Sequence, residues 1–136
     1  MYKNIMVPID LDMAEKGKVM LDKVKELTDE GGKVTVMYVV EDVPGLITAE
    51  LPDELVPKAA QSARSNLVHM VKAAGLTADV QIRSGRPHHA IVSLADEIGA
   101  DLILIASHGP VLQDYLLGST AASVVRHAKC SVLVTR

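Results

Sequence analysis

Two kinds of hydrophobic pattern alternate along the chain. Continuous apolar runs are typical of strands buried on both faces of a parallel sheet, whereas apolar positions three, four and seven residues apart indicate helices with one buried face. Strands are predicted at Asn4 to Asp10, Val34 to Val40, Thr77 to Arg83, Asp101 to Ala106 and Ser131 to Thr135. The third of these alternates apolar and polar residues, so we expect it near an edge of the sheet.

Helical spacing predicts four helices between the strands. The first starts near Met13 and is expected to end at Gly31-Gly32, because glycine commonly follows the last turn of a helix. The second runs from Leu55 to Gly75, after an irregular connection that contains proline and glycine. The third follows Pro87, a residue that the first helical turn tolerates, and the fourth spans Gly118 to His127.

The alternation of strands and helices predicts βαβ units and a parallel sheet with right-handed crossovers. A chain of 136 residues is too short for an eight-stranded α/β barrel, which needs about 250 residues, so a doubly wound sheet is favoured. We therefore expect a single α/β domain over residues 1–136, in three layers with helices on both faces of the sheet. Ligands of such sheets bind beyond the carboxyl ends of the strands.

Composition disfavours several classes of function. The 14 Lys and Arg against 17 Asp and Glu give a net charge of -3, so nucleic acid is not the expected partner. With three Tyr and neither Phe nor Trp, the chain has little material for stacking bases or a flavin ring. A single cysteine, Cys130, excludes an internal disulfide and fits a reducing compartment.

The apolar runs are also too short to cross a membrane. None approaches the roughly 18 residues that a membrane-spanning helix needs, and the first residues carry no signal-peptide pattern. We therefore expect a cytoplasmic protein without membrane insertion.

The densest set of small and turn-forming residues lies after the fourth strand. Ala106-Ser107-His108-Gly109-Pro110 follows the strand, and Leu116-Leu117-Gly118-Ser119-Thr120 leads into the last helix. A loop that returns to a helix N-terminus presents backbone N–H groups and the positive end of the helix dipole, which together hold phosphates. Ser119 either adds a hydroxyl to this anion site or simply caps the helix. The chain contains no Gly-Lys-Ser or Gly-Lys-Thr, so the loop is not a Walker A loop.

Several segments, taken together, point to a known family. They are Ile5-Met6-Val7-Pro8-Ile9-Asp10, Val36-Met37-Tyr38-Val39-Val40, the run from Ala100 to Gly109, and Leu117-Gly118-Ser119-Thr120 followed by Val124 to Ala128 and Ser131 to Val134. Through these segments the whole chain resembles the universal stress protein family, an adenosine-nucleotide-binding α/β group. The resemblance implies a sheet of order 3-2-1-4-5 with ATP, AMP or ADP in its crevice, with or without Mg2+. It also implies a homodimer paired through the last strand, Ser131 to Thr135, and leaves open its further assembly into a tetramer.

By this resemblance, the nucleotide site combines three strand ends with the start of the last helix. Asp10 would accept a hydrogen bond from ribose or adenine, although it could instead cap the next helix. Val39 would pack against the adenine edge, although it could instead be plain core. The implied residues are Pro8, Ile9, Asp10 and Val39 around the nucleoside, Ile105 and Ala106 beside the ribose, and Ser107, His108, Gly109, Gly118, Ser119 and Thr120 around the phosphates.

The phosphate loop departs from the family pattern at two places. The family's glycine, two residues, glycine, nine residues, glycine and Ser/Thr fall on Ala106, Gly109, Gly118 and Ser119. Ala106 thus replaces the first glycine, and eight residues instead of nine separate Gly109 from Gly118. We interpret these departures as a shortened-loop variant of the site.

The resemblance favours a nucleotide-binding regulatory protein, a dimer whose occupancy by ATP or AMP changes how it engages a regulatory partner or a stress response. An alternative is a slow Mg2+-dependent ATP hydrolase, for which the chain offers no base beyond Asp10 and His108 and no phosphate-loop lysine. A further alternative is a nucleotide-free dimeric scaffold for protein contacts. Cys130 lacks a neighbouring base, and we interpret it as a packing thiol, not a nucleophile.

Overall fold

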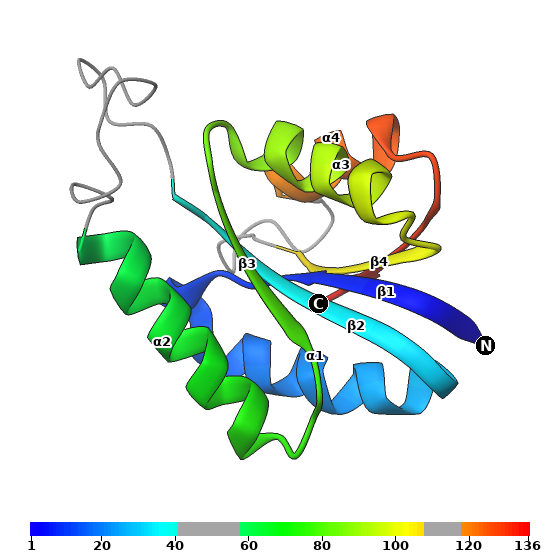
Figure 1. Cartoon of the computed structure of the whole chain (residues 1–136). Coiled ribbons are helices and arrows are strands. Elements are labelled where there is room, and N and C mark those ends of the chain that lie inside the picture. Colours follow the sequence, from blue (N-terminus) through cyan, green and yellow to red (C-terminus); the bar gives the residue numbers. More distant parts are fainter. Residues whose placement is uncertain (41–57, 108–117) are drawn as a thin grey trace.

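Five parallel strands form the central sheet of the computed structural model, which describes residues 1–40, 58–107 and 118–136 (Figure 1). The strands are β1 (Tyr2–Pro8), β2 (Thr28–Val40), β3 (Asp79–Ser84), β4 (Leu102–Ala106) and β5 (Ser131–Thr135). They pair in the order β3-β2-β1-β4-β5, and every neighbouring pair is parallel. The predicted order is confirmed, and β3 lies at one edge, as its alternating pattern indicated.

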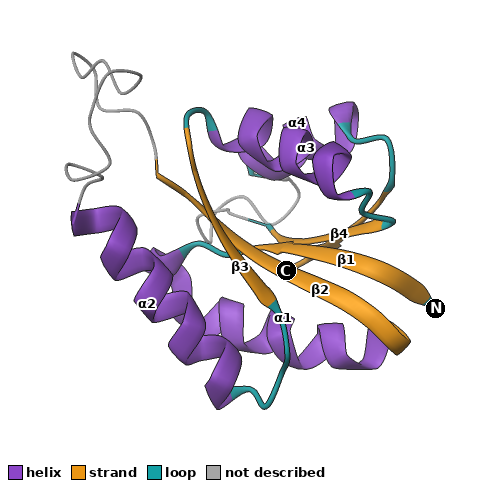
Figure 2. Cartoon of the chain, in the orientation of Figure 1, coloured by secondary structure: helices purple, strands orange, loops and turns teal. Residues whose placement is uncertain are grey.

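Helices cover both faces of this sheet (Figure 2). A short 3-10 helix, η1 (Leu11–Met13), leads into α1 (Ala14–Leu27), which lies on the same face as α2 (Lys58–Ala73). The helices α3 (Pro87–Ile98) and α4 (Ser119–His127) pack on the opposite face. The predicted three-layer, doubly wound architecture is therefore confirmed. Among the described helices, none is both long and apolar enough to span a bilayer.

Each face of the sheet has its own hydrophobic core. Successive side chains of a strand point to opposite faces, so Ile5 and Val7 of β1 pack towards α1 and α2, whereas Met6 packs towards α3 and α4. All three side chains are fully buried, which explains the lack of polar alternation in β1. The helices complete the two cores with Met20, Leu21, Val24, Leu67 and Val71 on one face, and with Ile91, Leu94, Ala95, Ala121 and Val124 on the other.

The first helix ends earlier than the sequence indicated. It stops at Leu27, and β2 begins at once, so Gly31-Gly32 lies inside the strand and not at the helix end. Thr28 ends the helix because its backbone N–H and its hydroxyl both donate to the carbonyl of Val24 while its own backbone is extended. Gly31 instead adopts φ +78° near a shift in the register between β1 and β2. The expectation of a glycine helix cap was therefore wrong.

Most of the remaining boundaries follow the predictions closely, although β2 begins at Thr28 and not at the predicted Val34. The third helix does begin at Pro87, and the last strand has the predicted bounds. The first strand ends at Pro8, before the predicted Asp10. The predicted start of the second helix at Leu55, and the connection before it, lie outside the described residues.

Candidate functional site

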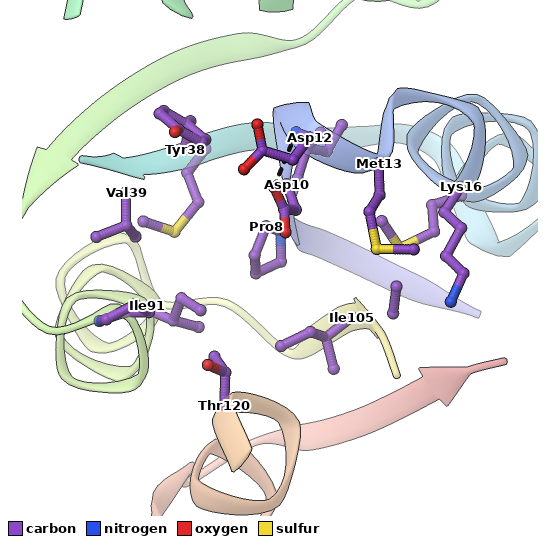
Figure 3. A pocket seen from close by; sticks show the side chains of 15 residues that line it. Pro8, Asp10, Asp12, Met13, Lys16, Tyr38, Val39, Ile91, Ile105 and Thr120 are labelled. Atoms are coloured by element: carbon purple, nitrogen blue, oxygen red, sulfur yellow. Dashed lines mark hydrogen bonds between the residues drawn. The ribbon is translucent and has the colours of Figure 1, made fainter. Parts of the chain in front are cut away.

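The path of the chain diverges at the carboxyl ends of β1 and β4, which are neighbours in the sheet. The chain leaves β1 for α1 on one face, while α4, which follows β4 in the chain, lies on the other face (Figure 2). Such a divergence leaves a crevice beyond the strand ends, where ligands of α/β sheets bind. A cavity of about 350 Å³ lies here, within the size range of small-molecule sites. Figure 3 shows the side chains around it.

The cavity gathers many of the residues that the sequence indicated. Those that line it are Pro8, Ile9, Asp10, Val39, Ile105, Ala106 and Thr120. Ser107, Gly118 and Ser119 are close to these in sequence but do not line the cavity. His108 and Gly109 lie outside the described residues. Side chains from β1, β2, β4 and α4 therefore meet at one place.

Asp10 has a structural role at the edge of the cavity. Its Oδ1 accepts a hydrogen bond from the backbone N–H of Asp12 at 2.9 Å, and its own carbonyl accepts one from the N–H of Met13 at 3.0 Å (Figure 3). These bonds make Asp10 the N-cap of η1. The capping alternative is therefore observed, at a residue that also lines the cavity.

One side of the cavity is apolar. Figure 3 shows Val39 of β2 and Ile91 of α3 on this side, near Tyr38. Met37 of β2 and Pro87 of α3 also line the cavity. Ile91 is buried, and the strand ends are tied together because the N–H of Ile9 donates to the carbonyl of Met37 at 2.8 Å. A wall of this kind suits a flat apolar group such as a purine ring.

The end of β4 forms another side of the cavity. Ile105 and Ala106 line it, and the cavity extends to Ala106, so the methyl group that replaces the family glycine does not close it. Ser107 is buried, and its N–H donates to the carbonyl of Thr135 at 2.6 Å, which continues the pairing of β4 with β5 by one residue.

The start of α4 lies beside this strand end. Gly118 is its N-cap, with an ordinary extended backbone, and as a glycine it supplies no side-chain cap to the first turn. Ser119 is the first residue inside the helix and Gly118 holds the N-cap position, so the alternative that Ser119 caps the helix is wrong. Thr120 is half-buried and lines the cavity. The N–H groups of the first helical turn have no partner within their own helix, and they carry the positive end of its dipole.

Lys16 of α1 is the most important residue that the sequence reasoning missed. It lines the cavity, and its Nζ donates to the backbone carbonyl of Ser107 at 3.0 Å. Among the described side chains that line the cavity, Lys16 supplies the positive charge, against the carboxylates of Asp10 and Asp12. A local signal existed, because Met13, Lys16 and Met20 are three and four residues apart and so share one helical stripe. The other lining residues missed are Asp12, Met13, Met20, Met37, Tyr38, Pro87 and Ile91.

The cysteine lies in a different environment, before β5. Burial raises the pKa of the Cys130 thiol, and the nearby carboxylates of Asp96 and Asp101 raise it further, against a lowering hydrogen bond from its own backbone. The thiol form is therefore favoured. Within residues 1–40, 58–107 and 118–136, no three or more His, Cys, Asp or Glu side chains gather closely enough to hold a metal ion.

Comparison with known sequences gives consistent matches over the full length. The sequence matches the Universal stress protein family over residues 1–136. It is 28% identical over 145 residues to Universal stress protein G of Escherichia coli O157:H7, and the match covers 100% of both chains.

Solved structures show the same architecture. Hypothetical protein MJ0577, whose structure was determined to assign its biochemical function, superposes with a TM-score of 0.78 at 30% identity, covering 99% of this chain and 96% of that one. The universal stress protein from Archaeoglobus fulgidus in complex with dAMP superposes with a TM-score of 0.65 at 25% identity, covering 99% of this chain and 98% of that one.

Proposed function

This chain belongs to the universal stress protein family, and on that basis we propose that the cavity beyond β1 and β4 binds an adenine nucleotide. The observation that carries the proposal is a cavity of about 350 Å³ lined by three strand ends at the crevice of a doubly wound sheet. The complex of the Archaeoglobus fulgidus protein with dAMP supports the same class of ligand.

The adenine ring lies against the apolar wall in this proposal. Val39 and Ile91 cover its faces, and the Asp10 carboxylate faces the hydroxyl groups of the ribose. Ile105 and Ala106 flank the sugar. The phosphates are taken up by the segment that follows β4 and by the first turn of α4, with Ser107, His108, Gly109, Gly118, Ser119 and Thr120 around them.

Binding rather than rapid turnover is the proposed activity. The protein acts as a cytoplasmic regulator, one domain over residues 1–136, whose occupancy by ATP, ADP or AMP changes its affinity for a partner protein. The second subunit of a homodimer pairs at β5, the edge strand opposite β3, where the side chain of Leu133 is 40% exposed. An open strand edge with an exposed apolar residue favours such pairing.

The direct test is isothermal titration of nucleotide-stripped protein with AMP, ADP and ATP, with and without Mg2+. We expect micromolar to millimolar dissociation constants. A nucleotide at 100 times its dissociation constant should also stabilise the fold by about 2.7 kcal/mol, which a thermal unfolding scan detects. The absence of binding and of stabilisation by all three nucleotides would contradict the proposal.

A pair of variants locates the site. Val39→Trp fills the apolar side of the cavity and should remove nucleotide binding. Val19→Trp makes the same change at a side chain of α1 that is 53% exposed, and it should bind as the unmodified protein does. Equal affinity in both variants, with cooperative unfolding retained, would place the nucleotide elsewhere.

A further inference from the structure

Both the backbone and the side-chain ammonium group of Lys16 are held in place beside the cavity. Its backbone lies in the first turn of α1, and its Nζ reaches the carbonyl of Ser107 at 3.0 Å. Ser107 is buried and bonded through its N–H to Thr135, so the acceptor belongs to the end of the sheet. The side chain of Lys16 is half-buried, unlike that of Lys18 two residues later, which is exposed.

The close approach of α1 to β1 fixes this position. Gly17 is buried, and a Cβ atom there would lie 3.2 Å from Cγ2 of Ile9, a residue that itself lines the cavity. Met13 and Met20 line the cavity on the same helical stripe. The ammonium group of Lys16 is therefore presented to the cavity wall by a packed helix.

Charge is unevenly distributed around the cavity. Figure 3 shows Val39 and Ile91 on one side and Met13 and Lys16 on the other. Among the described lining side chains, Asp10 and Asp12 carry negative charge and Lys16 carries the positive charge. An anionic group on the ligand is repelled by the two carboxylates and attracted by the ammonium, so it is expected at the Lys16 side.

We propose that Lys16 is a specificity-determining residue that selects 5′-phosphorylated adenosine over adenosine itself by donating to a phosphate oxygen, an inference that rests on the proposed nucleotide site. An ammonium has three N–H donors, so Lys16 donates to a phosphate while keeping its bond to the Ser107 carbonyl. The bond to an anionic oxygen is shorter and stronger than one to a neutral carbonyl. The chain thereby supplies from α1 the lysine that its phosphate loop lacks.

The test compares adenosine with AMP in matched variants. Lys16→Gln removes the charge and keeps a donor for Ser107, and Lys16→Met removes both. We expect either change to weaken AMP binding about tenfold and to leave adenosine binding within about twofold, because a hydrogen bond between charged groups is lost only with AMP. Lys18→Gln is the control at the exposed neighbour and should change neither affinity. Lys16→Arg keeps the charge and should retain AMP binding within about threefold.

Salt dependence gives a second readout. Raising the ionic strength should weaken AMP binding to the unmodified protein more than AMP binding to Lys16→Gln, because screening acts on the charge that the variant lacks. Unchanged AMP affinity in Lys16→Gln would overturn the inference. So would an equal loss for adenosine and AMP, which would mean that Lys16 acts only through Ser107. If the unmodified protein binds neither ligand, the proposed function itself fails, and that result is distinct from the other two.

Discussion

Asn4 and Asp101 exchange two hydrogen bonds: the N–H of Asn4 donates to Oδ1 of Asp101 at 3.0 Å, and the N–H of Asp101 donates to the carbonyl of Asn4 at 2.9 Å. Oδ2 of Asp101 accepts from the N–H of Lys3 at 2.8 Å. The side-chain amide of Asn4 donates to the carbonyls of Ile98 and Gly99 at the end of α3. The starts of β1 and β4 are thus joined at the end of the sheet opposite the cavity.

The free energy of unfolding should depend on pH because the Asp101 carboxylate is hydrogen-bonded in the native state. Desolvation raises its pKa, but hydrogen bonds from the N–H groups of Lys3, Asn4 and Asp101, with the positive N-terminus, together hold the pKa below its ordinary value of 3.8. The native state therefore favours the ionised form. Its contribution to stability is complete above that ordinary value and is lost as the pH falls through the lower folded-state pKa.

Asp101→Asn should lower the free energy of unfolding by about 1–2 kcal/mol at neutral pH, because a hydrogen-bonded charge is lost. The difference from the unmodified protein should shrink as the pH falls below about 4. Urea unfolding at a series of pH values measures it. Asp22→Asn is the control, at an exposed carboxylate 3.8 Å from Lys25, and should change stability by less than about 1 kcal/mol. A difference for Asp101→Asn that does not depend on pH would contradict the expectation.

Substitutions of Gly17 should show a steep dependence on size. A Cβ atom would lie 2.8 Å from Cε of Met70, which is flexible and can move, and 3.2 Å from Cγ2 of Ile9. Gly17→Ala should stay within about 1 kcal/mol of the unmodified protein, because the gain in helix propensity offsets the crowding. Gly17→Val should lower the free energy of unfolding by about 1–3 kcal/mol. Lys18→Val, at the exposed neighbour, introduces the same side chain without the close approach, although it loses helix propensity where Gly17→Val gains it. An equal or larger cost at Lys18 would disprove the close approach at Gly17.

Cys130 should react slowly with thiol reagents. Burial raises its pKa, and Asp96 and Asp101 raise it further, so the thiolate is scarce near neutral pH. We expect slower modification by iodoacetamide in the native protein than in urea-unfolded protein. Asp96→Asn should increase the native rate, since it removes one of the charges that raise the pKa. Equal rates of modification in native and unfolded protein would contradict a partly buried Cys130 thiol with a raised pKa.

The proposed dimer predicts a sensitive position on β5. Leu133→Lys places a charge on an exposed position of the edge strand and should convert a dimer to a monomer, as light scattering after size-exclusion chromatography would show. Val19→Lys, on an exposed part of α1, should leave the assembly unchanged. A monomeric unmodified protein, or a Leu133→Lys variant that remains dimeric, would reject pairing at this edge.

The layers of the fold could be predicted because each strand and helix has a local hydrophobic pattern. The strand order could be predicted because the resemblance to the family implies it. The buried strands have continuous apolar runs, and the edge position of β3 follows from its alternation. The end of α1 could not be predicted, because Thr28 offers two donors to one carbonyl and ends the helix before the glycines. Competition between a side chain and the backbone decides such boundaries.

The candidate site also contains residues that could be predicted from the sequence and residues that could not. Pro8, Asp10 and Ile105 could be named in advance because they end strands or follow them, and strand ends meet at the crevice of this fold. Lys16 and Ile91 lie on helices, and their presence at the cavity depends on how each helix packs across the sheet. That packing depends on residues far apart in sequence, such as Gly17, which has no Cβ, and Met70, whose side chain lies next to it.

The pairing of β1 with β4 also determines when the site can form. Ile5 pairs with Leu102 and Met6 with Ile103, roughly 100 residues further along the chain. Forming these contacts costs conformational entropy, because it closes a long loop. Domains that depend on contacts of such long range fold more slowly than those with local contacts. The cavity therefore cannot form until the chain has been synthesised through β4. Under the proposed function, a nucleotide binds only the folded sheet and so stabilises the product of folding.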